Sequence, residues 1–536
     1  MRKMPLKITV LTDTHYYSLK SGSSGKAYET ASAKSQKLLA GSGELLETAF
    51  EQIASDKETD ILLISGDVTN NGELTAHEEF IGMLRALKEK GKRIFVITAT
   101  HDFRKGGETD AYDGDRVIKT QTATRDMLWD MYKEFGPDDA ISVHRQSMSY
   151  VVQLCDGFRL FALNDDSNLN GKSGFSDECF EWISFEAEKA RNEGQFIIAM
   201  THHPLIAPSP IYEIIGKGDM LGDYDKRLPD LADLGIQFIL TGHTHIHNIS
   251  AAQSERGNVI YDICTGTPIG YPGVIRQLYI DTENKVVKAS TDYVDEPESY
   301  VRKGIKLREV FENQLIGTIK GMINAAGEDI DKLAQMATAI SIKPKVIYKF
   351  GWIIKPVFKL LNSLKVGTVA KWTKKETGLK SSDYAEIKDK KVVDIITELA
   401  LNLFGGESKY PPETPTYKIT IGLLNIIDSI LDTLHINLKK ILKVVPDAAS
   451  LVEPLLYNGK IDSYEANLKI YSFVSEGDTY EKLVFDKTAP TVNKSKKGPF
   501  IIVTGLLVLL AFLPVWLIII LAAFLHNRIK FADKLK

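Results

Sequence analysis

The first half of the chain alternates short, almost continuously apolar segments with segments of helical periodicity. The apolar segments are rich in β-branched and aromatic residues and lie at 6–13, 60–67, 93–100, 149–165, 195–203 and 236–244. Helical patterns separate several of them, at 43–56, 75–91, 176–194 and 226–235. Strands that are apolar throughout are covered on both faces, as in layered α/β folds. We therefore expect a layered α/β core.

Histidine or aspartate follows five of these expected strands directly. The residues are Asp13 and His15, Asp67, His101 and Asp102, His202 and His203, and His243 and His245. Ligands bind at the carboxyl ends of strands in open α/β sheets. Residues two apart point to the same side of a strand, so each D-x-H or H-x-H pair can share one centre. Imidazoles mixed with carboxylates bind Zn, Mn or Fe ions.

The order and spacing of these motifs resemble those of the calcineurin-like metallophosphoesterases. The motifs are Asp13-Thr14-His15, Gly66-Asp67, His101-Asp102, His202-His203-Pro204 and Gly242-His243-Thr244-His245. The resemblance covers about residues 6–290. It implies a double-layered β sandwich flanked by helices, with two divalent or trivalent metal ions (Mn, Fe or Zn) at one edge. Two ions suit displacement at phosphorus, because they stabilise both the attacking and the leaving oxygen.

The resemblance also implies a role for each motif residue. One ion would be held by Asp13, His15 and His245, the second by His202 and His243, and Asp67 would bridge the two. His101 would face the phosphoryl group and assist the leaving oxygen. Asp102 would orient His101 and favour its protonated form.

One position departs from the family pattern. The family usually has Gly-Asn before the histidine at 101, and the asparagine oxygen ligates the second ion, whereas this chain has Ala99-Thr100. Three interpretations stay open: Thr100 ligates, a water takes the position, or the second site is weak. We expect Thr100 or a water, with a retained but looser second ion. His203 and Asn70 are further candidates for metal or substrate contact.

The pattern of apolar residues changes near residue 295. Amphipathic helical patterns follow, with apolar residues at three- and four-residue steps. We expect a catalytic domain at 1–295, a mainly helical domain at 296–490, and a third part at 491–536. The uncharged segment 500–525 is long enough to span a bilayer. It predicts a single-pass C-terminal membrane anchor, and without an N-terminal signal the catalytic domain would be cytoplasmic.

Composition excludes some classes of function. The net charge of −4 gives no basis for binding a nucleic-acid polymer. Three widely spaced cysteines form no disulfide framework.

The motifs predict hydrolysis of small-molecule phosphate esters by a hydroxide that bridges two metals. The segment 65–73, SGDVTNNGE, resembles bacterial cyclic-nucleotide phosphodiesterases, which favours phosphodiesters such as cyclic nucleotides. One alternative is a membrane-tethered pyrophosphatase or phosphatase of a lipid-linked or nucleotide-sugar substrate. Another is a metal-binding scaffold with weakened catalysis.

Overall fold

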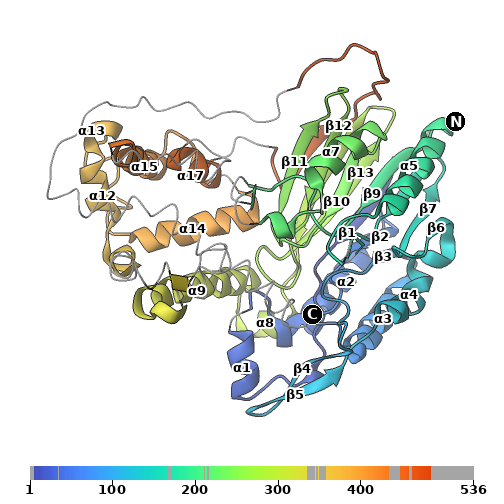
Figure 1. Cartoon of the computed structure of the whole chain (residues 1–536). Helices are drawn as coiled ribbons and strands as arrows, with labels where there is room; N and C mark the ends of the chain where they lie inside the picture. The colour runs from blue at the N-terminus through green and yellow to red at the C-terminus, as the bar shows by residue number, and fades with distance from the viewer. Residues whose placement is uncertain are drawn as a thin grey trace.

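Two β-sheets face each other, and the C-terminal helices lie to one side of them, as the computed structural model shows (Figure 1). The structure describes residues 5–483, except 34, 167, 170, 210–211, 214–215, 333, 335–343, 346–347, 349–357, 408, 434–446 and 458–460. Between the sheets lies an apolar layer built from alternate residues of both, such as Ile8 and Leu63 from one sheet and Leu160 and Met200 from the other.

The first sheet has six strands in the order β15-β14-β13-β1-β2-β3. Its strands are β1 (Leu6–Leu11), β2 (Ile61–Ser65), β3 (Arg93–Ile97), β13 (Val274–Asp281), β14 (Val286–Tyr293) and β15 (Glu465–Lys469). The strands β1, β2 and β3 are parallel. Their carboxyl ends, which carry three of the predicted motifs, therefore meet at one edge.

The second sheet has seven strands in the order β11-β12-β10-β9-β8-β7-β6. They are β6 (Ala140–His144), β7 (Ser149–Cys155), β8 (Phe158–Ala162), β9 (Phe196–Met200), β10 (Phe238–Thr241), β11 (Asn248–Gln253) and β12 (Val259–Cys264). The strands β8, β9, β10 and β12 are parallel. The remaining two motifs follow β9 and β10.

Helices cover the outer face of each sheet. The helices α2 (Ser42–Ser55) and α3 (Leu74–Glu89) pack on the first sheet, and α5 (Asp177–Asn192) and α7 (Tyr224–Asp233) pack on the second. Two shorter helices, α1 (Lys26–Ser32) and α4 (Arg125–Tyr132), lie in connections. This arrangement confirms the mixed α/β sheets flanked by helices that the sequence predicted.

A helical region follows the sheets, as expected. It contains α8 (Glu298–Lys303), α9 (Leu307–Glu328), α12 (Val366–Trp372), α13 (Lys374–Thr377), α14 (Val392–Gly405), α15 (Pro415–Thr433) and α17 (Ala448–Leu456). Its apolar core continues into the core beneath α2 and α3. After α17 the chain returns to the first sheet, where β15 pairs with β14 at the edge. The division at 295 stays a prediction, and this strand shows that the sheet draws on residues far beyond it.

The predicted membrane anchor requires a correction. Among the described residues, no helix combines the length and the apolar character that a bilayer crossing needs. The longest, α9, spans 22 residues but carries Arg308, Glu309, Glu312 and Lys320. The segment 500–525 on which the prediction rested lies outside the described residues. The structure therefore supports neither the predicted single-pass anchor nor the membrane localisation that depended on it.

The acidic segment 108–115 belongs to a hairpin of β4 (Glu108–Asp113) and β5 (Arg116–Gln121). Thr109 and Ala111 of β4 are buried while their neighbours are more exposed, which is the alternation of a strand with one covered face.

Candidate metal centre

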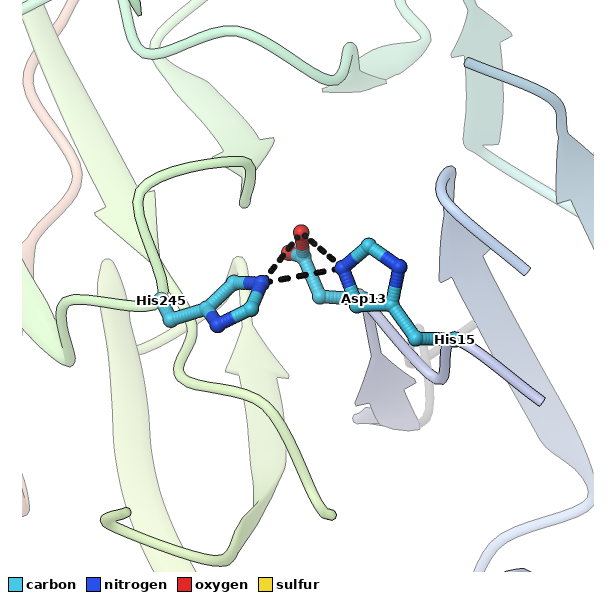
Figure 2. A group of neighbouring side chains, drawn as sticks. All are labelled: Asp13, His15 and His245. Atoms are coloured by element: carbon cyan, nitrogen blue, oxygen red, sulfur yellow. Dashed lines mark hydrogen bonds and ion pairs between the residues drawn. The ribbon is translucent and has the colours of Figure 1, made fainter. Parts of the chain in front are cut away.

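The first group of candidate ligands joins loops that follow β1 and β10. His15 Nε2 lies 3.0 Å from His245 Nε2 and 3.5 Å from Asp13 Oδ1. The distance from His245 Nε2 to Asp13 Oδ1 is 3.2 Å. Figure 2 shows the three side chains pointing toward one another. All three are buried, and their ligand atoms lie close enough together to bind one ion.

The second group joins the loops after β2, β9 and β10. His202 Nε2 lies 3.2 Å from Asp67 Oδ2 and 3.2 Å from His243 Nδ1. Asp67 Oδ2 is also only 3.7 Å from His15 Nε2 of the first group. Asp67 thus stands between the two groups, where a bridging carboxylate is required. The structure brings all six predicted metal ligands together in two adjacent groups.

Backbone carbonyls orient two of the imidazoles. His202 Nδ1 lies 2.8 Å from the carbonyl oxygen of Ser65, and His15 Nδ1 lies 3.3 Å from that of Thr69. A proton on each Nδ1 donates to the carbonyl and leaves the Nε2 lone pair directed at the group of ligands. Metal-binding histidines are held by such contacts, which fix both tautomer and ring orientation.

The backbone is strained at the ligands. Five of the six have a positive φ: Asp13 52°, His15 38°, Asp67 51°, His243 63° and His245 55°. Only three other non-glycine residues in the described part of the chain share this conformation. Each costs on the order of 1–3 kcal/mol, and such outliers concentrate at functional sites. This backbone strain lowers the stability of the fold, and it therefore indicates a functional site at this edge of the sheets.

Two motif glycines are required by close packing. A Cβ at Gly66, where φ is 101°, would lie 2.7 Å from His202 Nδ1. A Cβ at Gly242 would lie 2.1 Å from Thr12 Oγ1 and 2.5 Å from Asp13 Oδ2. Glycine at these positions lets the ligand loops approach one another.

The charges of the site are those that metal ligands need. Burial would raise the pKa of Asp67, but His202 and His101 outweigh it, and the pKa lies well below the usual value. Burial lowers the pKa of His15 and His243 well below the usual range, which keeps them neutral. For His202, Asp67 overcomes burial and raises the pKa to about 10. A cation would replace this proton, because metal ligands bind deprotonated.

His101 lies beside the two groups but belongs to neither. Its backbone N–H donates to Asp67 Oδ1 at 2.8 Å, and its ring meets that of His15 edge-on with 4.8 Å between centroids. Nδ1 lies 2.5 Å from the carbonyl oxygen of Asn70. Burial lowers the pKa of His101 to about 3, against the effect of Asp67 and with further lowering by Lys37 and Arg104.

The predicted role of Asp102 needs correction. Its Oδ1 accepts hydrogen bonds from the backbone N–H and the hydroxyl of Thr69, at 2.9 and 3.1 Å, and its Oδ2 accepts one from the N–H of Ala99 at 2.7 Å. Because the carboxylate is bound by Thr69 of the loop after β2 and by Ala99 of its own loop, the Asn70 carbonyl, and not Asp102, orients His101. Burial raises the pKa of Asp102 to about 7.

Three residues were predicted as metal or substrate contacts without a fixed role. Thr100 Oγ1 is buried and has no hydrogen-bond partner among the described residues, so all three interpretations of this position remain open. His203 Nδ1 lies 3.0 Å from Asp165 Oδ2, and its ring packs against His243 with 4.2 Å between centroids. Asn70 contributes its backbone carbonyl to His101.

Sequence reasoning missed three charged residues beside the site. Asp165 binds His203, and Asp219 Oδ1 lies 3.8 Å from His243 Nε2. Lys37 acts electrostatically on both His15 and His101. None of them belongs to a motif. Asp219 lies in the segment 206–228, which contains several Pro, Gly and aromatic residues.

Two facing sheets with six histidine and aspartate ligands at one edge define a protein that can hold two metal ions. Imidazole nitrogen and carboxylate oxygen are suitable donors for Mn, Fe and Zn. Residues 6–247 match the sequence model of the calcineurin-like phosphoesterases. These residues therefore form a domain of the calcineurin-like metallophosphoesterase superfamily. This family hydrolyses phosphate esters with metal ions.

Several solved structures resemble the chain. A dimetal phosphatase from Danio rerio is 12% identical, with 55% of this chain and 98% of that chain covered and a TM-score of 0.38. A purple acid phosphatase from yellow lupin is 12% identical, with 56% and 53% covered and a TM-score of 0.33. The NAD nucleotidase of Haemophilus influenzae is 12% identical, with 55% and 50% covered and a TM-score of 0.30. A search of curated proteins found no match.

Proposed function

We propose that this chain hydrolyses phosphodiesters, such as cyclic nucleotides, at a dinuclear metal centre formed by Asp13, His15, Asp67, His202, His243 and His245. The observation that carries the proposal is the position of Asp67, which lies 3.7 Å from His15 Nε2 and 3.2 Å from His202 Nε2. Two cations held there would acidify a water and offset negative charge on the phosphate.

The residues around the metal ligands supply the remaining functions. Lys37 adds positive charge beside His15 and His101, which favours an anionic substrate. His101 is fixed by the Asn70 carbonyl, so its Nε2 is the ring nitrogen left to face the phosphoryl group. In the protonated form, this Nε2 donates to the leaving oxygen. The bound phosphate anion favours that form, because a nearby negative charge raises the pKa of an imidazole.

The choice of a diester rests on the Asn70–Gly72 segment. Its sequence resembles that of bacterial cyclic-nucleotide phosphodiesterases, and Asn70 makes the only hydrogen bond to the His101 ring that we find among the described residues. The resemblance thus concerns a segment at the site.

The test combines metal analysis with substrate comparison. Purified protein is loaded with Mn²⁺ and assayed with bis(4-nitrophenyl) phosphate, 3′,5′-cyclic AMP and the monoester 4-nitrophenyl phosphate. We expect two metals per chain and faster turnover of the diesters. Turnover restricted to the monoester would overturn the diester assignment. One metal or none, without turnover, would support the scaffold alternative.

A further inference from the structure

His247 lies two residues after the candidate ligand His245 and is completely buried. Its Nδ1 accepts hydrogen bonds from Gly266 N–H and Arg276 Nη2, both at 3.3 Å. Its Nε2 therefore carries the proton and donates to Thr291 Oγ1 at 2.9 Å. The loop that holds His245 is thus anchored to β13 and β14.

Arg276 extends this anchor to the far end of the chain. It is fully buried, and its Nη1 donates to Thr291 Oγ1 at 2.8 Å and to the carbonyl oxygen of Ser463 at 2.5 Å. Ser463 precedes β15. A buried guanidinium is costly unless it is hydrogen-bonded. Arg276 precedes the helical region in the sequence, and Ser463, which accepts one of its hydrogen bonds, follows that region.

The end of α14 touches the same loop directly. The backbone N–H of His247 donates to the carbonyl oxygen of Phe404 at 2.8 Å. Gly406 ends the helix with a φ of 64°, and a Cβ there would lie 1.8 Å from the carbonyl oxygen of His247. The helix and the ligand loop therefore meet at backbone contact, without room for a methyl group.

A second contact reaches Asp13 of the same ligand group. The loop after β12 donates from Thr267 Oγ1 to the carbonyl oxygen of Asp13 at 2.8 Å. The helix α9 packs on that loop, because its Phe311 ring lies 2.4 Å from where a Cβ of Gly273 would stand. Asp13 and His245 are thus both supported by helices of the C-terminal region.

Two of the three ligands of the second group are supported differently. His202 Nδ1 donates to the Ser65 carbonyl, and Asp67 accepts from the His101 N–H, so these contacts stay within the first 247 residues. Only His243 shares the loop of His245, so the C-terminal helices support the first group more than the second.

We propose that α9 and α14 position the first ligand group, so that metal binding by Asp13, His15 and His245 and docking of the C-terminal helices stabilise each other. This inference rests on the proposed metal centre. His247, Arg276 and Gly406 are positioning residues: they act through the ligand loop and touch no substrate. The helical region thus contributes to the metal site by positioning the first ligand group.

The first test introduces a methyl group at the contact. Gly406→Ala adds a Cβ against His247, whereas the control Gly378→Ala adds one at the end of α13, where φ is 67° and no atom lies within 4 Å. Both variants carry similar backbone strain. Mn²⁺ affinity is measured in a His202→Ala background, which leaves the first group, and in a His15→Ala background, which leaves the second.

We expect Gly406→Ala to weaken Mn²⁺ binding on the order of tenfold in the His202→Ala background and by less in the His15→Ala background, since altered supporting contacts typically cost that much. Gly378→Ala should change neither affinity. Equal affinities of the two glycine variants, or equal weakening in both backgrounds, would overturn the inference. Absence of Mn²⁺ binding by the unsubstituted protein would instead contradict the proposed function.

Hydrogen exchange of the unsubstituted protein gives a second test, which needs no folded variant. Coupling is reciprocal, so Mn²⁺ should slow amide exchange in α14 relative to the chelated protein. The helix α5, on the outer face of the second sheet, is the control and should change less. Exchange in α14 that is unaffected by Mn²⁺, in protein that binds the metal, would overturn the inference.

Discussion

His101 combines a fixed ring orientation with a low pKa. Burial lowers its pKa to about 3, and its Nδ1 is held by Asn70. The imidazole is therefore neutral until an anion binds nearby, which suits a group that takes up its proton only in the presence of substrate.

His101→Ala tests this role. The variant removes the ring but keeps the backbone N–H that donates to Asp67. General acid catalysis typically contributes 10²–10⁴-fold, so we expect turnover of the diester to fall by about that factor with metal content unchanged. His144→Ala is the control, since His144 bonds only within its own turn among the contacts described. Parallel loss of metal and turnover would make His101 a ligand instead.

Thr100 offers a gain-of-binding experiment. Its buried hydroxyl lacks a hydrogen-bond partner in the described structure, and the next residue, His101, donates its backbone N–H to Asp67 of the second ligand group. Thr100→Asn would supply a longer side chain with an amide oxygen, and we expect the weaker of the two Mn²⁺ affinities to improve on the order of tenfold. Calorimetric titration measures both sites. Unchanged affinity would show that residue 100 does not reach the second ion.

At the residue scale, the grouping of the candidate ligands could be predicted but their backbone could not. The family resemblance, carried by motif order and spacing, pointed to the six residues that the structure brings together. Nothing in the sequence indicates that Asp13 or His245 adopts a positive φ. The Asp102 error has a similar origin, since adjacency in sequence does not tell which way a carboxylate turns.

The strand β12 carries a buried carboxyl group that binds the loop after β9. Asp262 of β12 accepts hydrogen bonds from the N–H groups of Leu205 and Ile206 at 2.7 and 2.8 Å, and from Thr241 Oγ1 at 2.5 Å. Leu205 and Ile206 follow the His202-His203 motif in the sequence. Burial raises the pKa of Asp262 to about 6, despite these hydrogen bonds.

This pKa predicts a pH-dependent effect of Asp262→Asn. Between pH 3.8 and about 6 the folded state binds more protons at Asp262 than the unfolded state, so this residue makes stability fall as pH rises. The difference is on the order of 3 kcal/mol. Asn keeps the acceptor for Leu205 and Ile206, so the variant should gain stability relative to the unsubstituted protein as pH rises from 4 to 7.

Denaturant unfolding at pH 4, 5, 6 and 7 measures that relative stability. Asn248→Ala in β11, a strand at the sheet edge, controls for loss of a polar side chain whose bond to Ser250 does not titrate. A relative stability of Asp262→Asn that stays constant with pH would contradict the assignment.

At the element scale, continuous apolar strands and strongly periodic helices were predicted well, because burial on both faces leaves an unmistakable composition. The β4–β5 hairpin was missed because only Thr109 and Ala111 face inward, between charged neighbours. The strand β15 was missed for the same reason: its buried residues, Ala466 and Leu468, alternate with polar ones over only five positions.

Across the whole molecule, one apolar core joins α2 and α3 to the C-terminal helices. Metal bound to the folded state stabilises it by mass action, by about 2.7 kcal/mol at a concentration 100 times the Kd. We therefore expect Mn²⁺ to raise Tm, with the sheets and the helical region unfolding together in one calorimetric transition. The chelated protein is the reference, and Mg²⁺, which prefers oxygen ligands, should have a smaller effect. Two transitions, of which Mn²⁺ moves only one, would contradict this expectation.

At this scale the sequence predicted two regions correctly in kind, sheets first and helices later. It could not predict how they join, because the connection depends on single contacts such as Arg276 with Ser463 and on the short strand β15.

The position of β15 has a consequence for synthesis on the ribosome. The first sheet ends at β14 until residues 465–469 emerge, so a growing chain exposes the unpaired backbone of Val286–Tyr293 while all the helices in between are being made. Exposed strand edges invite pairing with other chains. The nascent protein is therefore most exposed to misassembly just before β15 arrives, and a truncation upstream of Glu465 would retain that open edge permanently.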